Sequence, residues 1–96
     1  MAAQQYIGAG RQSATQNVAY TGTAAASTVF SSQTYKVRLL ATTDCYFRIG
    51  DGTPTATTSD SYLPALAAEY FTCTPGQKVS AVQVTAAGSL NVTEII

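Results

Sequence analysis

Carboxylates and thiols are the side chains of this protein that could take part in chemistry. The chain has five acids, Asp44, Asp51, Asp60, Glu69 and Glu94, two cysteines, Cys45 and Cys73, and no histidine. General acid–base catalysis needs a group whose pKa lies near the operating pH, and histidine is the usual one. Each acid stands at an expected turn or strand end, which explains it without catalysis. The sequence therefore predicts a protein that is not an enzyme.

The same residues form no pattern for a bound metal or cofactor. Zinc takes about four Cys or His ligands, or three with an open position, and this chain offers two cysteines. Asp51, Asp60 and the loop between them offer oxygen atoms to calcium, but the regular acidic spacing of a calcium loop is missing. We therefore expect no metal and no cofactor. Cys45 and Cys73 fall in different expected strands, so a disulfide and two buried thiols are both compatible with the sequence.

Composition narrows the classes of partner. The chain has 96 residues, enough for one domain, and only 10% of them are charged, against about 25% in ordinary soluble domains. Its five basic and five acidic side chains cancel, so we expect neither a nucleic acid nor a membrane as a partner. A net charge near zero favours association between proteins. The first residues lack the basic and apolar regions of a secretory signal, so synthesis in a cytoplasm is expected.

Alternating apolar and polar residues indicate strands separated by short turns. The clearest strand covers residues 35–39, and a second one, over residues 45–49, is near enough to form a hairpin with it. Pro64 interrupts the next apolar segment, so we expect an edge strand there. Three further strands, within residues 69–74, 78–85 and 90–96, are expected to form a meander. Residues 31–96 are therefore predicted to form one all-β domain, an antiparallel β-sandwich or jelly-roll-like barrel.

The first thirty residues differ from the rest. Residues 1–30 are rich in Ala, Gln, Ser, Thr and Gly and lack a sustained apolar period. They are predicted to form an extended N-terminal arm with weak strands. Tyrosine is enriched at protein interfaces. The candidate interface residues are the tyrosines expected to be exposed, together with the one charged residue of the arm: Tyr6, Tyr20, Tyr62 and Arg11.

Residues 35–94 resemble the small structural proteins of tailed bacteriophages known as capsid decoration or cement proteins. The segments that carry the resemblance are Val37-Arg38-Leu39, residues 44–50 (Asp-Cys-Tyr-Phe-Arg-Ile-Gly), Leu63-Pro64, Glu69-Tyr70-Phe71, residues 75–79 (Pro-Gly-Gln-Lys-Val) and residues 88–94 (Gly-Ser-Leu-Asn-Val-Thr-Glu). The resemblance implies a β-sandwich or jelly-roll fold, a homotrimer, and attachment to the outside of the capsid where subunits of the major capsid protein meet. No single binding residue is carried over, because these proteins contact the shell in different ways.

The expected function is therefore that of a structural virion protein on the capsid surface, with the major capsid protein as its partner. A tail, connector or fibre-associated virion protein is the nearest alternative, because all of these use small β-sandwiches. A binding module for carbohydrate or another host surface is the other alternative. That module would carry exposed aromatic side chains clustered on one face.

Overall fold

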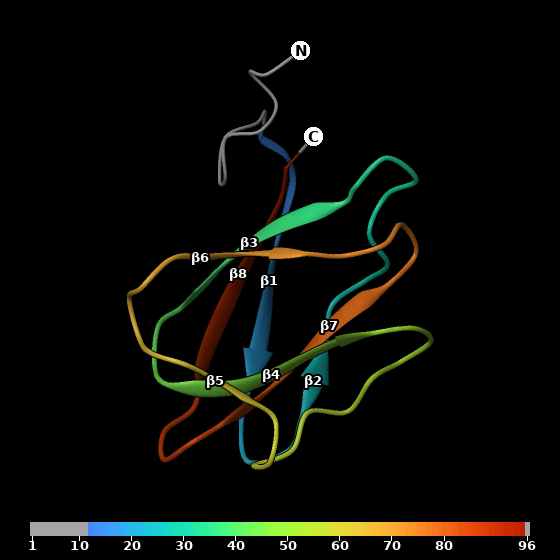
Figure 1. Ribbon diagram of the computed structural model, residues 1–96. Coiled ribbons are helices and arrows are strands. Elements are labelled where there is room, and N and C mark those ends of the chain that lie inside the picture. Colours follow the sequence, from blue (N-terminus) through green and yellow to red (C-terminus); the bar gives the residue numbers. More distant parts are fainter. Residues whose placement is uncertain (1–11, 96) are drawn as a thin grey trace.

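The computed structural model describes residues 12–95, and every regular element in this part of the chain is a β-strand (Figure 1). The eight strands described are β1 (Gln12–Tyr20), β2 (Ala25–Ala26), β3 (Lys36–Ala41), β4 (Cys45–Gly50), β5 (Ser61–Leu63), β6 (Glu69–Thr72), β7 (Lys78–Gln83) and β8 (Gly88–Ile95). In β3 the residues alternate between buried and partly exposed, as a strand with one wet face requires. The prediction of an all-β protein is confirmed.

The strands pair as in a chain that is folded back on itself and then rolled up. β1 pairs with β8, β2 with β7, β3 with β6 and β4 with β5, all antiparallel. Two further ladders, β3 with β8 and β4 with β7, join these pairs into two four-stranded sheets, ordered β1-β8-β3-β6 and β2-β7-β4-β5. This is the strand order of a jelly roll, a sandwich of two Greek keys. The predicted sandwich or jelly-roll-like fold is confirmed.

Two of the expected strand arrangements are wrong. β3 and β4 lie in different sheets and form no hairpin, and β6, β7 and β8 alternate between the sheets instead of forming a meander. Alternation along a strand identifies its buried face but not its neighbour. The three residues between β3 and β4 span about 10 Å when extended, which is the distance between packed sheets. A short connection therefore permits a crossing between sheets as readily as a hairpin.

The expected boundary between an N-terminal arm and a domain beginning at residue 31 is wrong for residues 12–30. β1 is an edge strand that runs antiparallel to β8, and Val18, Tyr20 and Phe30 belong to the core. This region looks polar because an edge strand exposes most of its side chains, so that β1 buries only Val18 and Tyr20. Residues 1–11, the rest of the predicted arm, lie outside the described residues.

The core lies between the two sheets and is filled by the inward-facing side chains of both. Its fully buried members include Val37, Leu39, Leu90 and Val92 from the first sheet and Cys45, Val79 and Ala81 from the second. Phe47 and Phe71 contact each other from opposite sheets, with ring centroids 4.7 Å apart. β5 pairs only with β4, at the edge of its sheet. The edge strand expected beside Pro64 is therefore confirmed.

Candidate interface at the two ends of the sandwich

The four residues predicted from the sequence as interface residues have different outcomes. Tyr6 and Arg11 lie outside the described residues. Tyr20 is only 1% exposed, so its prediction as an exposed interface residue is wrong. Tyr62 is 49% exposed and is available for contact. The structure thus places Tyr62 on the surface and Tyr20 in the core.

Tyr20 is buried because its hydroxyl group has partners inside the protein. The hydroxyl donates to the carbonyl oxygen of Thr43 over 2.6 Å and accepts a bond from the Thr43 N–H over 3.3 Å. A buried tyrosine needs such partners for its O–H. Tyr20 therefore ties β1 to the connection between β3 and β4, which is a role within the fold.

Tyr62 belongs to a polar cluster at the edge of the second sheet. Its ring stands edge-on to that of Tyr46, with centroids 5.5 Å apart and planes at 85°. Its hydroxyl donates to the Asp44 carboxylate, which also accepts the N–H of Ala65 over 2.7 Å. The bond from Tyr62 lowers the pKa of Asp44, and the carboxylate raises the pKa of Tyr62 to about 12. At neutral pH the pair therefore consists of a charged acceptor and a protonated donor.

The loop that follows Tyr62, residues 64–68, presents Leu66 to solvent. Leu66 is 77% exposed, more than any other large apolar side chain described. It is also the one non-glycine residue within residues 12–95 with positive φ, at 61°. Its N–H donates to the carbonyl of Ala41 over 2.8 Å, and Ala41 forms a parallel bridge with Ala65. The loop is therefore held by main-chain bonds in a conformation that bulky residues rarely adopt.

Sequence reasoning missed Leu66. The signal that could have found it is the run Pro-Ala-Leu-Ala-Ala over residues 64–68, which joins two expected strands without one polar residue. A connection of this kind lies on the surface, and a run of exposed apolar residues usually has a functional reason. We call Asp44, Tyr62 and residues 64–68 together the Leu66 end of the sandwich.

Two further apolar side chains are exposed at the opposite end. Val29 is 55% exposed and Tyr35 is 64% exposed. Both adjoin the turn between β6 and β7, because the N–H of Cys73 donates to the Tyr35 carbonyl and the N–H of Gly76 donates to the Phe30 carbonyl. Figure 1 shows this region on the right of the sandwich and the β5–β6 loop on the left. We call Val29, Tyr35 and residues 73–77 the Tyr35 end.

A buried carboxylate organises the chain that leads into Tyr35. Glu94 is 3% exposed, and one of its oxygens accepts the N–H of Ser31 over 3.0 Å and the hydroxyl of Thr34. The Ser31 and Thr34 hydroxyls are also hydrogen-bonded to each other. Glu94 lies on the inner side of β8, one residue before the strand ends. It therefore fixes the β2–β3 connection to the last strand.

Each cysteine lies near one of these carboxylates and is a free, buried thiol. Burial raises the pKa of Cys45 to about 11, and the neighbouring Asp44 carboxylate also raises it, against a hydrogen bond with Tyr20. Burial likewise raises the pKa of Cys73 to about 11, with a smaller contribution from Glu94. Both groups are therefore protonated at neutral pH, which is the unreactive form of a thiol.

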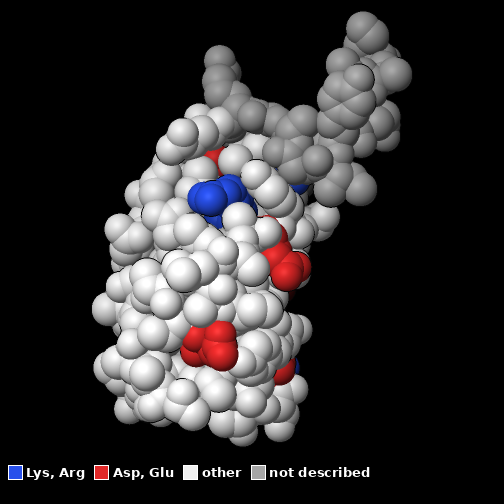
Figure 2. Space-filling model, turned by 90° about the vertical axis from the view of Figure 1, so that its left-hand side faces the viewer, with Lys and Arg blue, Asp and Glu red and all other residues white. Residues whose placement is uncertain are grey.

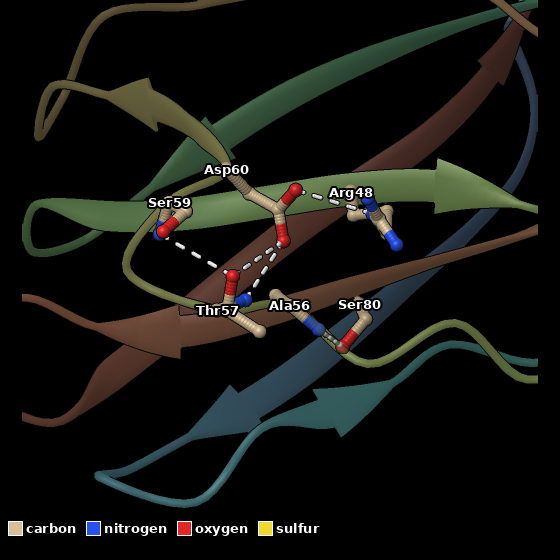
Figure 3. A network of polar contacts seen from close by, with 6 residues as sticks. All are labelled: Arg48, Ala56, Thr57, Ser59, Asp60 and Ser80. Carbon is tan, nitrogen blue, oxygen red and sulfur yellow. Dashed lines mark hydrogen bonds and ion pairs between the residues drawn. The ribbon is translucent and has the colours of Figure 1, made fainter.

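A third carboxylate, Asp60, orders the long loop between β4 and β5. Figure 3 shows Asp60 between Thr57 and Arg48, with one oxygen accepting the Thr57 N–H over 2.8 Å and the other 3.1 Å from the Arg48 Nε. The Thr57 N–H is the main reason that the pKa of Asp60 is lowered. One residue before Thr57, the Ala56 N–H donates to the buried Ser80 hydroxyl. These contacts fasten the loop to the second sheet.

The acids considered as calcium ligands have other partners. Both oxygens of Asp60 are used by Thr57 and Arg48, and an oxygen of Asp51 accepts a bond from Gln77 over 3.4 Å. Among residues 12–95, no group of three or more His, Cys, Asp or Glu side chains is placed to hold a metal ion. The same residues include no helix long and apolar enough to cross a membrane.

The exterior has few charges, and they are scattered. Figure 2 shows the face that is on the left in Figure 1, which includes the β5–β6 loop, and most of it is uncharged with separate acidic and basic spots. This agrees with the five acids and five bases of the whole chain. A surface of this kind meets other protein surfaces with a low desolvation cost for charged groups.

Comparison with known proteins gives no match. No protein-family model, no curated protein and no solved structure matches this chain. The functional argument therefore rests on the chain's own residues and geometry.

Proposed function

We propose that this chain is a structural protein of a tailed-bacteriophage virion, and specifically a capsid decoration or cement protein. It binds the outer shell and stabilises contacts between subunits of the major capsid protein. The observation that carries the proposal is the exterior of the jelly roll. Large apolar side chains, Leu66, Val29 and Tyr35, are exposed at its two ends on a surface whose charges are few and balanced.

This exterior suits contacts with other protein subunits. Exposed apolar patches with polar rims mark interaction sites, and aromatic residues such as Tyr35 and Tyr62 are enriched at interfaces. A protein that attaches in many copies to a repeating lattice needs only a modest contact at each site, because linked contacts reinforce one another. The resemblance to decoration proteins that was inferred from the sequence motifs of residues 35–94 motivates the same role.

The residues that precede β1 have a place in this proposal. β1 begins at Gln12, and the earlier residues include Tyr6 and Arg11, two of the candidate interface residues. We propose that residues 1–11 contact a neighbouring shell subunit. Deletion of residues 2–11 leaves all eight described strands in place, so the shortened protein is expected to fold and to bind the shell more weakly. Unchanged binding would contradict this part of the proposal.

Binding to shells tests the proposal directly. Shells assembled from the major capsid protein of the same genome, without this protein, are mixed with increasing amounts of the purified chain and sedimented. We expect saturable binding in a fixed ratio to the shell subunit, and shells that withstand higher temperature before they disassemble. Binding only to isolated tails or connectors would favour the alternative virion roles. Absence of binding to any virion part would contradict the proposal.

One observation favours a second candidate, a binding module for carbohydrate. The edge-to-face pair of Tyr46 and Tyr62 lies on the outer side of the second sheet, beside the Asp44 carboxylate. An exposed aromatic ring with a nearby acceptor is suited to stacking and hydrogen bonding with a sugar, and jelly rolls occur in lectins. A glycan array followed by thermal denaturation tests it. A glycan that raises the melting temperature of the wild type but not of Tyr62→Ser would support this function.

A further inference from the structure

Asp51 is the one acid of this chain that is followed by glycine. Asp51 and Gly52 are both exposed, and they form a bend directly after Gly50, the last residue of β4. Gly52 has a left-handed φ of 65°, and a Cβ atom added there would meet no heavy atom within 4 Å. The peptide bond between Asp51 and Gly52 therefore lies in open, irregular main chain, and no side chain shields its nitrogen atom.

An aspartate in this setting can react with its own main chain. The Gly52 nitrogen attacks Cγ of the Asp51 carboxylic acid, and the new carbon–nitrogen bond closes a succinimide ring. The Gly52 N–H proton and the carboxyl hydroxyl group leave together as water. Water then opens the ring. Addition at Cγ restores aspartate, whereas addition at the main-chain carbonyl carbon leaves the chain running through the side chain, as isoaspartate. No electrons are transferred, and water is the sole co-reactant.

The contacts of Asp51 leave it free to reach this geometry. Among residues 12–95 its carboxylate has one hydrogen-bond partner, the Gln77 side chain at 3.4 Å, which is longer than the usual range of about 2.7–3.2 Å. Within the same part of the chain the Gly52 N–H donates no hydrogen bond. Neither reacting group therefore has to break a strong contact first. Glycine also tolerates the backbone rotation that ring closure requires.

Asp60, in the same loop, shows the opposite arrangement (Figure 3). One of its oxygens accepts the Thr57 N–H over 2.8 Å, and the other lies 3.1 Å from the Arg48 Nε. The residue that follows, Ser61, belongs to β5 and pairs with Phe47. Turning the Asp60 carboxyl group toward the Ser61 nitrogen would break these hydrogen bonds, and each lost bond adds to the barrier. One loop thus contains one held aspartate and one free aspartate.

We propose that Asp51–Gly52 is a site of spontaneous covalent modification, at which the native protein forms isoaspartate. The product has one more carbon atom in its main chain and a free α-carboxylate. A carboxylate of this kind accepts a methyl group from S-adenosylmethionine, so the modified protein is a substrate for isoaspartyl methyltransferases. The reaction depends on this loop alone and is independent of the proposed function.

The modification would change how the β4–β5 loop meets the Tyr35 end. Gln77, which belongs to that end, contacts Asp51, and the Nζ of Lys78 lies 3.3 Å from the Thr53 Oγ1. A longer main chain at residue 51 displaces both loop residues relative to the start of β7. The hydrogen bonds of Asp60 lie farther along the loop and hold its second half in place. The expected change is therefore confined to the first half of the loop.

Prolonged incubation of the native protein, well below its melting temperature, tests the proposal. Trypsin leaves Asp51 and Asp60 in one peptide, residues 49–78, so electron-transfer fragmentation is used to locate isoaspartate within it. We expect isoaspartate at Asp51, a succinimide intermediate lighter by one water, and methyl transfer from S-adenosylmethionine by an isoaspartyl methyltransferase. Asp51→Glu has a longer side chain that closes a ring far less readily, so it should abolish both signals. Absence of isoaspartate at Asp51 in the native protein would overturn the proposal.

Ser61→Gly tests whether the fold, and not the Asp-Gly sequence alone, determines the site. This variant places a second Asp-Gly pair at residues 60–61, where the carboxylate is held by Thr57 and Arg48. In urea the two pairs should react at similar rates. In the folded variant Asp51 should react at least about tenfold faster than Asp60. Equal rates at the two pairs in the folded variant, or a faster reaction at Asp60, would overturn the inference. Binding to shells is measured separately, so neither result bears on the proposed function.

Discussion

The two ends of the sandwich share one feature, a carboxylate that accepts hydrogen bonds from a neighbouring connection, but the two carboxylates differ in their exposure to water. At the Leu66 end, the Asp44 carboxylate accepts bonds from Tyr62 and Ala65. At the Tyr35 end, the Glu94 carboxylate accepts bonds from Ser31 and Thr34. Each carboxylate fastens one connection between the sheets, and each lies near one buried thiol.

The difference between the ends is the exposure of these carboxylates to water. Glu94 is buried, whereas Asp44 is partly exposed. When the acceptor of a buried hydrogen bond is removed, its donor is left unsatisfied, whereas a donor at the surface forms a hydrogen bond with water instead. The comparison therefore indicates that Glu94 contributes mainly to the stability of the fold, and Asp44 mainly to the shape of the loop that presents Leu66.

Substitution of Glu94 should have the largest effect. Glu94→Ala leaves the Ser31 N–H and the Thr34 hydroxyl without their acceptor, and we expect a loss of about 3 kcal/mol in the free energy of unfolding. Denaturation in urea measures it. Glu94→Gln keeps an acceptor oxygen and should lose clearly less. A loss below about 1 kcal/mol for Glu94→Ala would mean that the two ends do not differ as described.

Gly88 tests the packing beside the Leu66 end. A Cβ atom at this position would stand 2.4 Å from the Thr43 Oγ1 and 2.9 Å from the Tyr20 hydroxyl oxygen. Gly88→Ala should therefore cost about 1–3 kcal/mol of stability, as overpacking does. At Gly22 the nearest atom to an added Cβ is 3.9 Å away. Gly22→Ala is the control, and we expect it to change the free energy of unfolding by less than about 0.5 kcal/mol. Equal losses for Gly22→Ala and Gly88→Ala would contradict the tight contact at Gly88.

The dependence of stability on pH should show how much the Asp44 carboxylate contributes to the folded state. Its folded pKa is lower than the ordinary value of 3.8 because Tyr62 and Ala65 donate to the carboxylate. The resulting stabilisation is present above the unfolded pKa and is lost as the pH falls through the folded pKa. The difference in melting temperature between wild type and Asp44→Asn should therefore be constant from neutral pH to about pH 5 and shrink in stronger acid. A difference that grows in acid would contradict the described bonds.

The thiols offer the smallest perturbation, because labelling them requires no substitution. With pKa values of about 11, Cys45 and Cys73 should react with a thiol reagent at pH 8 about 100-fold more slowly in the native protein than in urea. Both should react in urea without reductant, as free thiols do. Rapid labelling of one cysteine in the native protein would show that the end of the sandwich next to it opens more readily than the other end. Absence of reactive thiols in urea would show a disulfide instead.

Much of the fold follows from local sequence patterns. Alternation in residues 35–39 and 45–49 correctly predicts β3 and β4, because burial of one face imposes a period of two on a strand. Pro64 correctly predicts the edge position of β5, since proline removes a ladder donor. These signals depend on neighbouring residues only, which is why they can be read without a structure.

What escaped prediction depends on distant partners. The exchange of strands between the sheets is fixed by which inner faces meet, and the alternation carries no information about that. Tyr20 looks exposed in its polar segment, yet Thr43, 23 residues away, satisfies its hydroxyl in the core. Leu66 looks like an ordinary apolar residue until the bond to Ala41 fixes its left-handed conformation. Of the large apolar and aromatic side chains exposed within residues 12–95, the sequence therefore predicted Tyr62 but not Leu66, which is the most exposed.

Electron cryo-microscopy of shells saturated with this protein tests the central claim most directly. The account predicts density for the jelly roll on the outer surface where shell subunits meet, with the Leu66 side chain covered. Shells that carry no such density after saturation, or bound copies with residues 64–68 facing open solvent, would contradict it.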